Sequence, residues 1–207
     1  MLVLASASPR RSELLAQAGY AFEVIPSAIN EDLRPGEPPI GYVLRLAREK
    51  AEAVAASPEF ASVCKIHQEP HLILGADTTV VAPNGAILAK PEDDADAVRM
   101  WRLLSGATHK VITGVALLAP RATDTITEVA AEVTYVTMLT PTDEELAAYI
   151  ATGEARGKAG AYGIQGQAAR WIPRVHGCYF NVVGLPLALV ASMIEGIEAR
   201  LGLATTI

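Results

Sequence analysis

Two arginines occupy positions where a positive charge is unfavourable. Ser8 is a good N-cap residue and Pro9 suits the first helical position, so Arg10 and Arg11 fall in the first turn of a helix predicted over residues 9–18. The unpaired N–H groups and the positive dipole end of that turn favour anions, and a cation there costs about 0.3 to 1 kcal/mol. The sequence therefore predicts that a bound anion offsets these charges.

Lys50 interrupts the apolar face of a second predicted helix, residues 40–56. Val43, Ala47 and Val54 share this face with Lys50, because the spacings are those of a helix. Two interpretations remain open. Either the lysine stem packs while its ammonium reaches solvent, or the lysine is functional.

Asp77 lies inside an otherwise apolar predicted strand, where an unpaired carboxylate is costly. The strand continues into a hairpin, whose turn we place at Asn84-Gly85 as type I′. In this register Thr79 faces Lys90, and Lys90 is diagonal to Asp77 on one face of the sheet. A structural Asp77–Lys90 ion pair and a functional site both fit this pattern.

The segment GKAGAYGIQG, residues 157–166, has a glycine at every third position. Such glycines let backbone N–H groups approach a ligand, although a plain flexible loop is the alternative. Lys158 and Gln165 are interleaved with them, so this segment is a further candidate for ligand binding.

Glu31, in an acidic and proline-rich loop, joins Asp77 as a carboxylate in an unusual setting. Cations around a polyanion, with paired acids for a divalent metal, form the arrangement that phosphoryl chemistry needs. The chain has no Walker A motif and no G-x-G-x-x-G after a strand, which argues against P-loop and Rossmann enzymes.

The elements that position these residues are those of an α/β protein. Predicted strands and helices alternate, so we expect a mixed twisted sheet flanked by helices. A chain of 207 residues can form one substantial core, or two lobes that share a sheet.

Composition narrows the class of protein further. The net charge of −6 and the pI of about 5.2 argue against a nucleic-acid partner. We expect no membrane segment, since no apolar run reaches the roughly 18 residues that a span needs, and no signal peptide. Cys64 and Cys178 are far apart, which favours free thiols in the cytoplasm.

Several motifs resemble, in order and spacing, those of the Maf family of nucleoside triphosphate pyrophosphatases. The resemblance runs from Leu2 to about Leu189. It implies a single domain over residues 1–207, with two lobes and a central cleft, similar in fold to inosine triphosphate pyrophosphatases and often dimeric. The motifs are SASPRRSELL, LAREKA, GADTTVV, the KP of Lys90-Pro91, LSGATHKVITGVAL, GKAGAYGIQG and NVVGLPL.

The resemblance also implies an activity. Such enzymes cleave a nucleoside triphosphate between its α and β phosphates and release a monophosphate and pyrophosphate, with Mg²⁺ or Mn²⁺. Arg10, Thr78 and Gln165 match the branch that acts on dTTP and UTP, whereas the branch that acts on 7-methyl-GTP differs at these positions. The Gln165 amide can both donate and accept, as a pyrimidine edge requires.

Site roles follow from this leading hypothesis. Asp77 is the proton acceptor for the attacking water, or holds the metal that activates it, and Glu31 is the metal's second ligand. Family members usually have Asp where this chain has Gly157, next to Lys158. The residues expected to hold the phosphates are Ser8, Arg11, Lys50, Lys90 and Lys158.

Two alternatives remain open. One is a nucleotide-binding regulator of septum formation that needs no turnover. The other is a pyrophosphatase for 7-methyl-GTP or noncanonical purine triphosphates. Under the leading hypothesis, modified pyrimidine nucleotides are further candidate substrates. The resemblance also implies a role in cell division arrest and in keeping modified nucleotides out of nucleic acids.

Overall fold

A computed structural model describes residues 1–67 and 70–203. It contains a seven-stranded sheet with the order β2-β1-β3-β5-β6-β7, to which β4 adds by pairing with β3. Parallel and antiparallel pairs both occur, so the predicted mixed α/β sheet is confirmed. No helix in the described part of the chain is long and apolar enough to cross a membrane.

The chain divides into two compact units. Unit 1 comprises Met1–Asp77, Thr113–Glu132 and Gly184–Ile207, and unit 2 comprises Thr78–Ile112 and Val133–Val183. The long strands β3 (Leu72–Val81), β5 (Thr108–Pro120) and β6 (Thr125–Thr137) contribute residues to both. The expectation of one domain with a central cleft stays a prediction, and residues 68–69 and 204–207 of its range lie outside the described residues.

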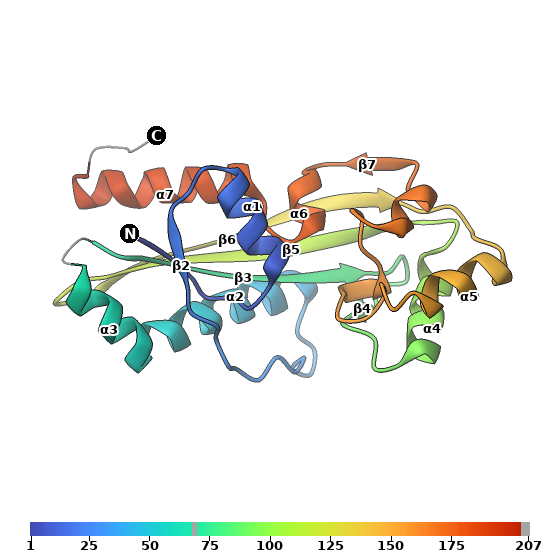
Figure 1. The fold of residues 1–207 in the computed structure, drawn as a ribbon, viewed down its shortest axis with the longest axis horizontal. Coiled ribbons are helices and arrows are strands. Elements are labelled where there is room, and N and C mark those ends of the chain that lie inside the picture. Colours follow the sequence, from blue (N-terminus) through green and yellow to red (C-terminus); the bar gives the residue numbers. More distant parts are fainter. Residues whose placement is uncertain (68–69, 204–207) are drawn as a thin grey trace. The chain divides into compact units, whose positions relative to one another are not determined.

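Unit 1 places helices on both sides of its strands. Strand β1 pairs in parallel with β2 and with β3. Figure 1 shows α2 and α3 on one side of these strands and α7 on the other. The predicted helices over 9–18 and 40–56 are confirmed to within a residue or two. The elements are β1 (Leu2–Leu4), α1 (Pro9–Gln17), β2 (Phe22–Val24), α2 (Pro39–Ala55), α3 (Pro58–Ile66) and α7 (Leu187–Leu201).

Helix α2 lies unusually close to the sheet. A Cβ atom added at Gly75 would collide with the carbonyl oxygen of Ala47, so only glycine allows this approach. Side chains alternate along β3, which puts Asp77 on the same face as Gly75 and Ile73. The close approach therefore brings the residues of α2 next to the carboxylate of Asp77.

Unit 2 is built from shorter elements. Asp93 caps α4 by accepting from the Asp96 N–H at 2.7 Å, and Thr142 and Glu145 form the capping box that opens α5. The elements are β4 (Ile87–Leu88), α4 (Asp94–Leu104), α5 (Asp143–Ala151), two 3₁₀ helices η1 (Ala159–Ala161) and η2 (Gln167–Trp171), β7 (Arg174–His176) and α6 (Tyr179–Val183).

The β3–β4 hairpin corrects the predicted register. Val81 pairs with Ile87, one residue away from the predicted pairing. The Gly85 N–H donates to the Ala82 carbonyl, so Pro83 occupies the first central position of the turn, where its fixed φ suits a type I turn. Gly85 then has φ +86 as the bulge residue. The predicted type I′ turn is wrong.

The slip matters because one residue of register exchanges the two faces of a strand. Strand β4 also ends at Leu88, before Lys90. The register argument that placed Lys90 on the face of Asp77 is therefore wrong, and the expected role of Lys90 rests on the family resemblance alone.

The core of unit 2 contains a cluster of aromatic rings. Trp101 lies 4.9 Å from Tyr149 and 5.3 Å from Trp171, measured between ring centroids. His109 Nε2 and the Tyr162 hydroxyl are hydrogen-bonded at 2.8 Å beside this cluster, and both residues are buried. Burial lowers the pKa of His109 to about 4, so the imidazole is neutral at physiological pH.

This buried histidine predicts an acid-sensitive stability. The unfolded chain binds a proton at His109 below about pH 6.5 while the folded chain does not. The free energy of unfolding therefore decreases as the pH is lowered. Between pH 7 and pH 5 the loss should be about 2 kcal/mol. Urea unfolding of His109→Gln across this range should lack that part of the pH dependence, whereas the exposed His176→Gln should keep it. Parallel curves for the wild type and His109→Gln would contradict the prediction.

Candidate active site

The centre of the candidate site is a buried lysine that contacts two carboxylates. The Lys50 ammonium lies 2.7 Å from Asp77 Oδ1 and 2.7 Å from Glu31 Oε1. Lys50 is 7% exposed and Asp77 is 8% exposed, so the ion pair is shielded from water. The interpretation of Lys50 as a lysine that reaches solvent is wrong, and its charge instead faces the two predicted metal ligands.

Helix α2 also holds the loop that carries Glu31. Residues 26–38 have no regular helix or strand. The Tyr42 hydroxyl donates to the Glu31 carbonyl oxygen at 2.8 Å, and Arg45 Nη2 donates to the Asp32 carbonyl oxygen at 3.1 Å. Since both donors come from α2, the backbone of Glu31 is fixed relative to Lys50.

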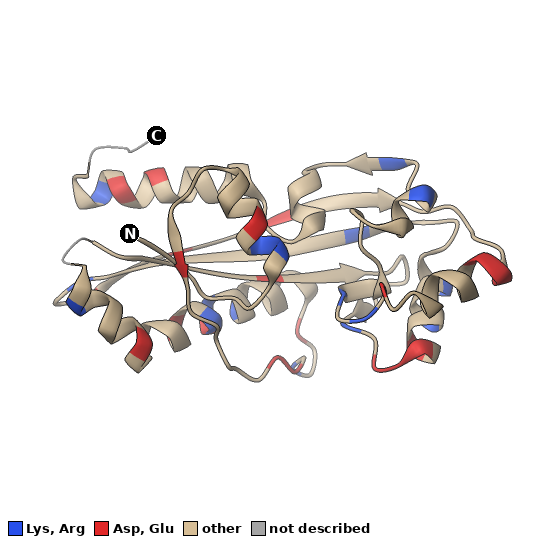
Figure 2. Ribbon diagram, in the orientation of Figure 1, with Lys and Arg blue, Asp and Glu red and all other residues tan. Residues whose placement is uncertain are grey.

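A network of charges between α2 and the loop before it strengthens this attachment. Arg45 makes two hydrogen bonds to the Glu37 carboxylate, at 2.6 and 2.7 Å, and a third to Glu49 at 3.0 Å. The hydrogen bonds from Arg45 lower the pKa of Glu37 to about 2, so the network persists well into acid. Figure 2 shows this mixture of acidic and basic residues along α2.

Arg11 is the arginine of the first turn of α1 that turns inward. Its Nε donates to the Gly184 carbonyl oxygen at 2.9 Å and its Nη1 to Ser6 Oγ at 3.1 Å. Burial lowers the pKa of Arg11, while the charges of Asp77 and Glu31 act in the opposite direction. Arg11 therefore lies within electrostatic reach of both carboxylates.

The first turn of α1 has no acidic residue, and the Ser8 side chain makes no capping hydrogen bond. The expectation of an anion near this turn thus keeps its basis in the structure.

The structure assigns the predicted site residues to both units. Those of unit 1 gather around Lys50 or follow β1. Thr78 follows Asp77 in β3, Lys90 is exposed just beyond β4, and Gln165 is exposed within a tight turn. The residues in unit 1 are Ser8, Arg10, Arg11, Glu31, Lys50 and Asp77, and those in unit 2 are Thr78, Lys90, Lys158 and Gln165.

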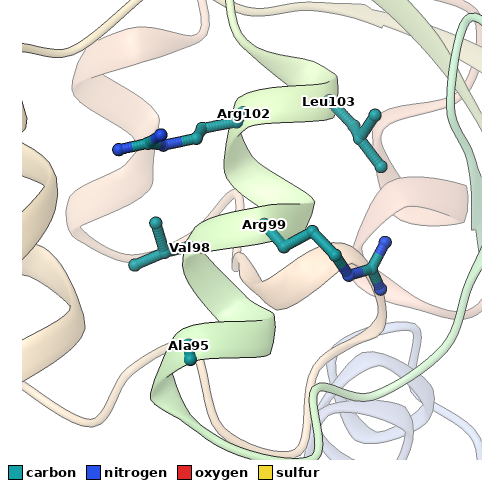
Figure 3. A pocket seen from close by; sticks show the side chains of 5 residues that line it. All are labelled: Ala95, Val98, Arg99, Arg102 and Leu103. Atoms are coloured by element: carbon teal, nitrogen blue, oxygen red, sulfur yellow. The ribbon is translucent and has the colours of Figure 1, made fainter.

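A separate surface depression lies on α4, and it contains none of the predicted site residues. Figure 3 shows Val98 and Arg102 pointing to one side of the helix, and Arg99 and Leu103 to the other. Ala95, Val98, Arg99, Arg102 and Leu103 line this depression.

The donor set fits a divalent cation. Mg²⁺ is usually held by one or two protein carboxylates together with substrate phosphates, and Mn²⁺ accepts the same oxygen ligands. Glu31 and Asp77 converge on one ammonium and supply two such carboxylates. Among the described residues, no group of three or more His, Cys, Asp or Glu forms a larger metal cluster.

Sequence reasoning missed the residues that hold the site together. Arg45 was visible only as the partner of Glu49 four residues along the helix, and that pair is confirmed at 3.0 Å. Its stronger contacts with Glu37, and the hydroxyl of Tyr42 on the loop backbone, depend on how the loop folds back. The L-R-L-A-R spacing of α2 gave no signal for them.

The chain is an α/β protein in which a buried lysine contacts two carboxylates and an arginine turns inward from the first turn of α1. Comparison with known proteins gives the family. The chain matches the model described as Maf-like protein over residues 1–197, and it belongs to the Maf family.

Its relatives are similar over almost their whole length. The chain is 50% identical over 194 residues to the dTTP/UTP pyrophosphatase of Koribacter versatilis, which covers 94% of this chain and 93% of the relative. It is 48% identical over 198 residues to the dTTP/UTP pyrophosphatase of Geobacter sulfurreducens, covering 96% and 97%. The match to the protein of the same name from Moorella thermoacetica is 48% over 194 residues, covering 93% of each.

The buried ion pair generates a prediction about stability. Lys50→Met leaves Asp77 buried without its cation, so the free energy of unfolding should fall by about 3 kcal/mol. Chemical denaturation measures this loss, with the exposed Lys65→Met of α3 as the matched control, expected to change stability by less than about 0.5 kcal/mol.

A double variant provides the decisive comparison. The Lys50→Met/Asp77→Asn double variant should lose much less free energy of unfolding than the sum of the losses of the two single variants, because the two groups interact directly. Additive losses would show that the ion pair contributes no coupling.

Proposed function

We propose that this chain hydrolyses dTTP and UTP to the monophosphate and pyrophosphate. The Lys50 ammonium between Glu31 and Asp77, with Arg11 in electrostatic reach, is the observation that carries the proposal. The relatives named dTTP/UTP pyrophosphatase support the choice of dTTP and UTP.

In this proposal Asp77 accepts a proton. Water adds to a phosphorus atom of the α–β anhydride, the bridging P–O bond breaks, and the proton of the water passes to the Asp77 carboxylate. Lys50 keeps this carboxylate oriented through the contact at 2.7 Å. A lysine ammonium has three N–H donors, so Lys50 can contact both carboxylates and still donate to a phosphate oxygen.

Glu31 and Asp77 are the residues that would hold Mg²⁺ or Mn²⁺. When bound there, the ion supplies charge neutralisation for the phosphates and acidifies a water molecule. Tyr42 and Arg45 keep the Glu31 backbone in place for this role.

The remaining phosphate contacts are assigned to Ser8, Arg11, Lys90 and Lys158. Arg11 suits two-pronged contact with phosphate oxygens, and its bonds to Gly184 and Ser6 orient the guanidinium.

Base selection is assigned to Arg10, Thr78 and Gln165. Gln165 is exposed and its amide can donate and accept at once, which matches the adjacent C=O and N–H groups of thymine and uracil. Modified pyrimidine nucleotides that keep this edge are further substrates in the proposal.

The proposal includes a homodimer, which is common in such proteins, and a cytoplasmic location. Cys64 and Cys178 are free thiols in the structure, as a reducing compartment would require. Light scattering of the purified protein tests the dimer.

The first test of the activity is Asp77→Asn. With dTTP and Mg²⁺, pyrophosphate release should fall by a factor of about 100 or more, because the proton acceptor is lost. The assay should include UTP, dGTP and 7-methyl-GTP, with the exposed Glu59→Gln of α3 as the control.

Each result of this panel has a definite meaning. Undiminished release from folded Asp77→Asn would overturn the assignment of Asp77. Turnover of 7-methyl-GTP or purines ahead of dTTP would replace the substrate, and binding without hydrolysis under every divalent metal would favour a nucleotide-binding regulator.

A second test separates the two neighbouring arginines. Arg11→Lys should lower kcat/KM for all nucleotides alike, because a lysine loses the two-pronged phosphate contact. Arg10→Ala should change the order of substrates instead. Equal losses on every nucleotide from both variants would contradict this division. Because Arg11 is buried, circular dichroism should be used to check that Arg11→Lys is folded.

A further inference from the structure

The carboxylate of Glu154 lies inside the glycine-rich loop. Glu154 Oε2 accepts the Gln167 N–H at 2.9 Å, and Oε1 lies 3.5 Å from the Tyr149 hydroxyl oxygen. A Cβ atom added at Gly166 would collide with this carboxylate, so the side chain of Glu154 fills the space beside Gly166. The position of residues 166 and 167 therefore depends on Glu154.

Gln165 lies immediately before this contact. The Gly166 N–H donates to the Gly163 carbonyl oxygen at 3.1 Å, which closes a turn with Ile164 and Gln165 at its centre. Ile164 is buried and Gln165 is exposed, so the turn presents the Gln165 amide outward.

The other end of the loop is held by different groups. The Ala161 carbonyl oxygen accepts hydrogen bonds from Trp101 Nε1 at 2.8 Å and from the Tyr149 hydroxyl at 3.3 Å. The Gly160 N–H donates to the Ala89 carbonyl oxygen at 3.2 Å. These contacts end before the turn, and the carboxylate of Glu154 contacts the far side of the turn.

Glu154 also holds Lys158. The Lys158 ammonium donates to the Glu154 carbonyl oxygen. The lysine stem packs against Gly163, where an added Cβ atom would lie 3.0 Å from Lys158 Cε. The residue before Lys158 is Gly157, which has no carboxylate. The backbone of Glu154 thus supplies an anchor for Lys158 that needs no carboxylate at position 157.

From these contacts we infer that Glu154 is a positioning residue for base recognition. Its carboxylate fixes the turn that presents Gln165, so its loss lets the Gln165 amide sample orientations that do not match a pyrimidine edge. The inference rests on the proposed function, because it assigns the selection of dTTP and UTP to Gln165.

The test compares three variants of Glu154. Glu154→Gln keeps an oxygen that can accept from Gln167 and should change the preference for dTTP over dGTP less than twofold. Glu154→Ala and Glu154→Asp cannot reach the Gln167 N–H, so each should lower that preference about tenfold, chiefly through the KM for dTTP. Glu144→Ala, an exposed carboxylate of α5, is the matched control.

A second measurement does not need turnover. The backbone N–H of Gln167 should exchange its hydrogen about tenfold faster in Glu154→Ala than in the wild type, and at the wild-type rate in Glu144→Ala. This measurement tests the contact in the intact protein. If Glu154→Ala is too unstable for kinetic work, Glu154→Asp can replace that variant.

The outcomes separate the inference from the proposed function. An unchanged dTTP preference in Glu154→Ala, together with a lowered preference in Gln165→Ala, would overturn the inference alone. An unchanged preference in Gln165→Ala would overturn base recognition by Gln165 and the inference with it. A wild-type protein without pyrophosphatase activity would overturn the proposed function, while an unchanged Gln167 exchange rate would overturn the role of Glu154 in holding the turn.

Discussion

The ammonium of Lys50 is the charge on which the candidate site depends. It lies in a buried position where a lysine is stable only with anionic partners, and Glu31 and Asp77 are those partners. One carboxylate comes from a strand and the other from a loop, so the lysine joins three parts of the chain that are far apart in sequence. Conversely, two carboxylates this close would repel each other strongly without it.

The geometry around Lys50 depends on the backbone as much as on the charges. Helix α2 can reach Asp77 because Gly75 has no side chain, and the same helix holds the loop of Glu31 through Tyr42 and Arg45. A single rigid helix thus positions one site residue directly and two others indirectly. This is an economical way to preorganise acidic groups, since their orientation is set before any ligand binds.

Much of this arrangement was predictable, because the unusual residues break the pattern around them. Lys50 on an apolar face and Asp77 in an apolar strand were both evident as exceptions, but their mutual contact was not, because it depends on how α2 crosses β3. The hairpin register failed because the Asn-Gly pair outweighed Pro83, whose ring fixes the turn type. Glu154 gave no signal at all, since a single acid after a helix is ordinary and its value lies in the loop that folds around it.

The aromatic cluster of unit 2 has a consequence for how this protein can be observed. The chain has two tryptophans, Trp101 and Trp171, and their rings pack against each other at 5.3 Å in unit 2. Trp101 also donates its indole N–H to the loop of Gln165 through the Ala161 carbonyl. Tryptophan emission therefore reports on the surroundings of that loop, and unit 1, where Lys50 and Asp77 lie, has no tryptophan of its own. Changes in unit 2 can be followed by tryptophan fluorescence, whereas unit 1 must be followed through its tyrosines and backbone.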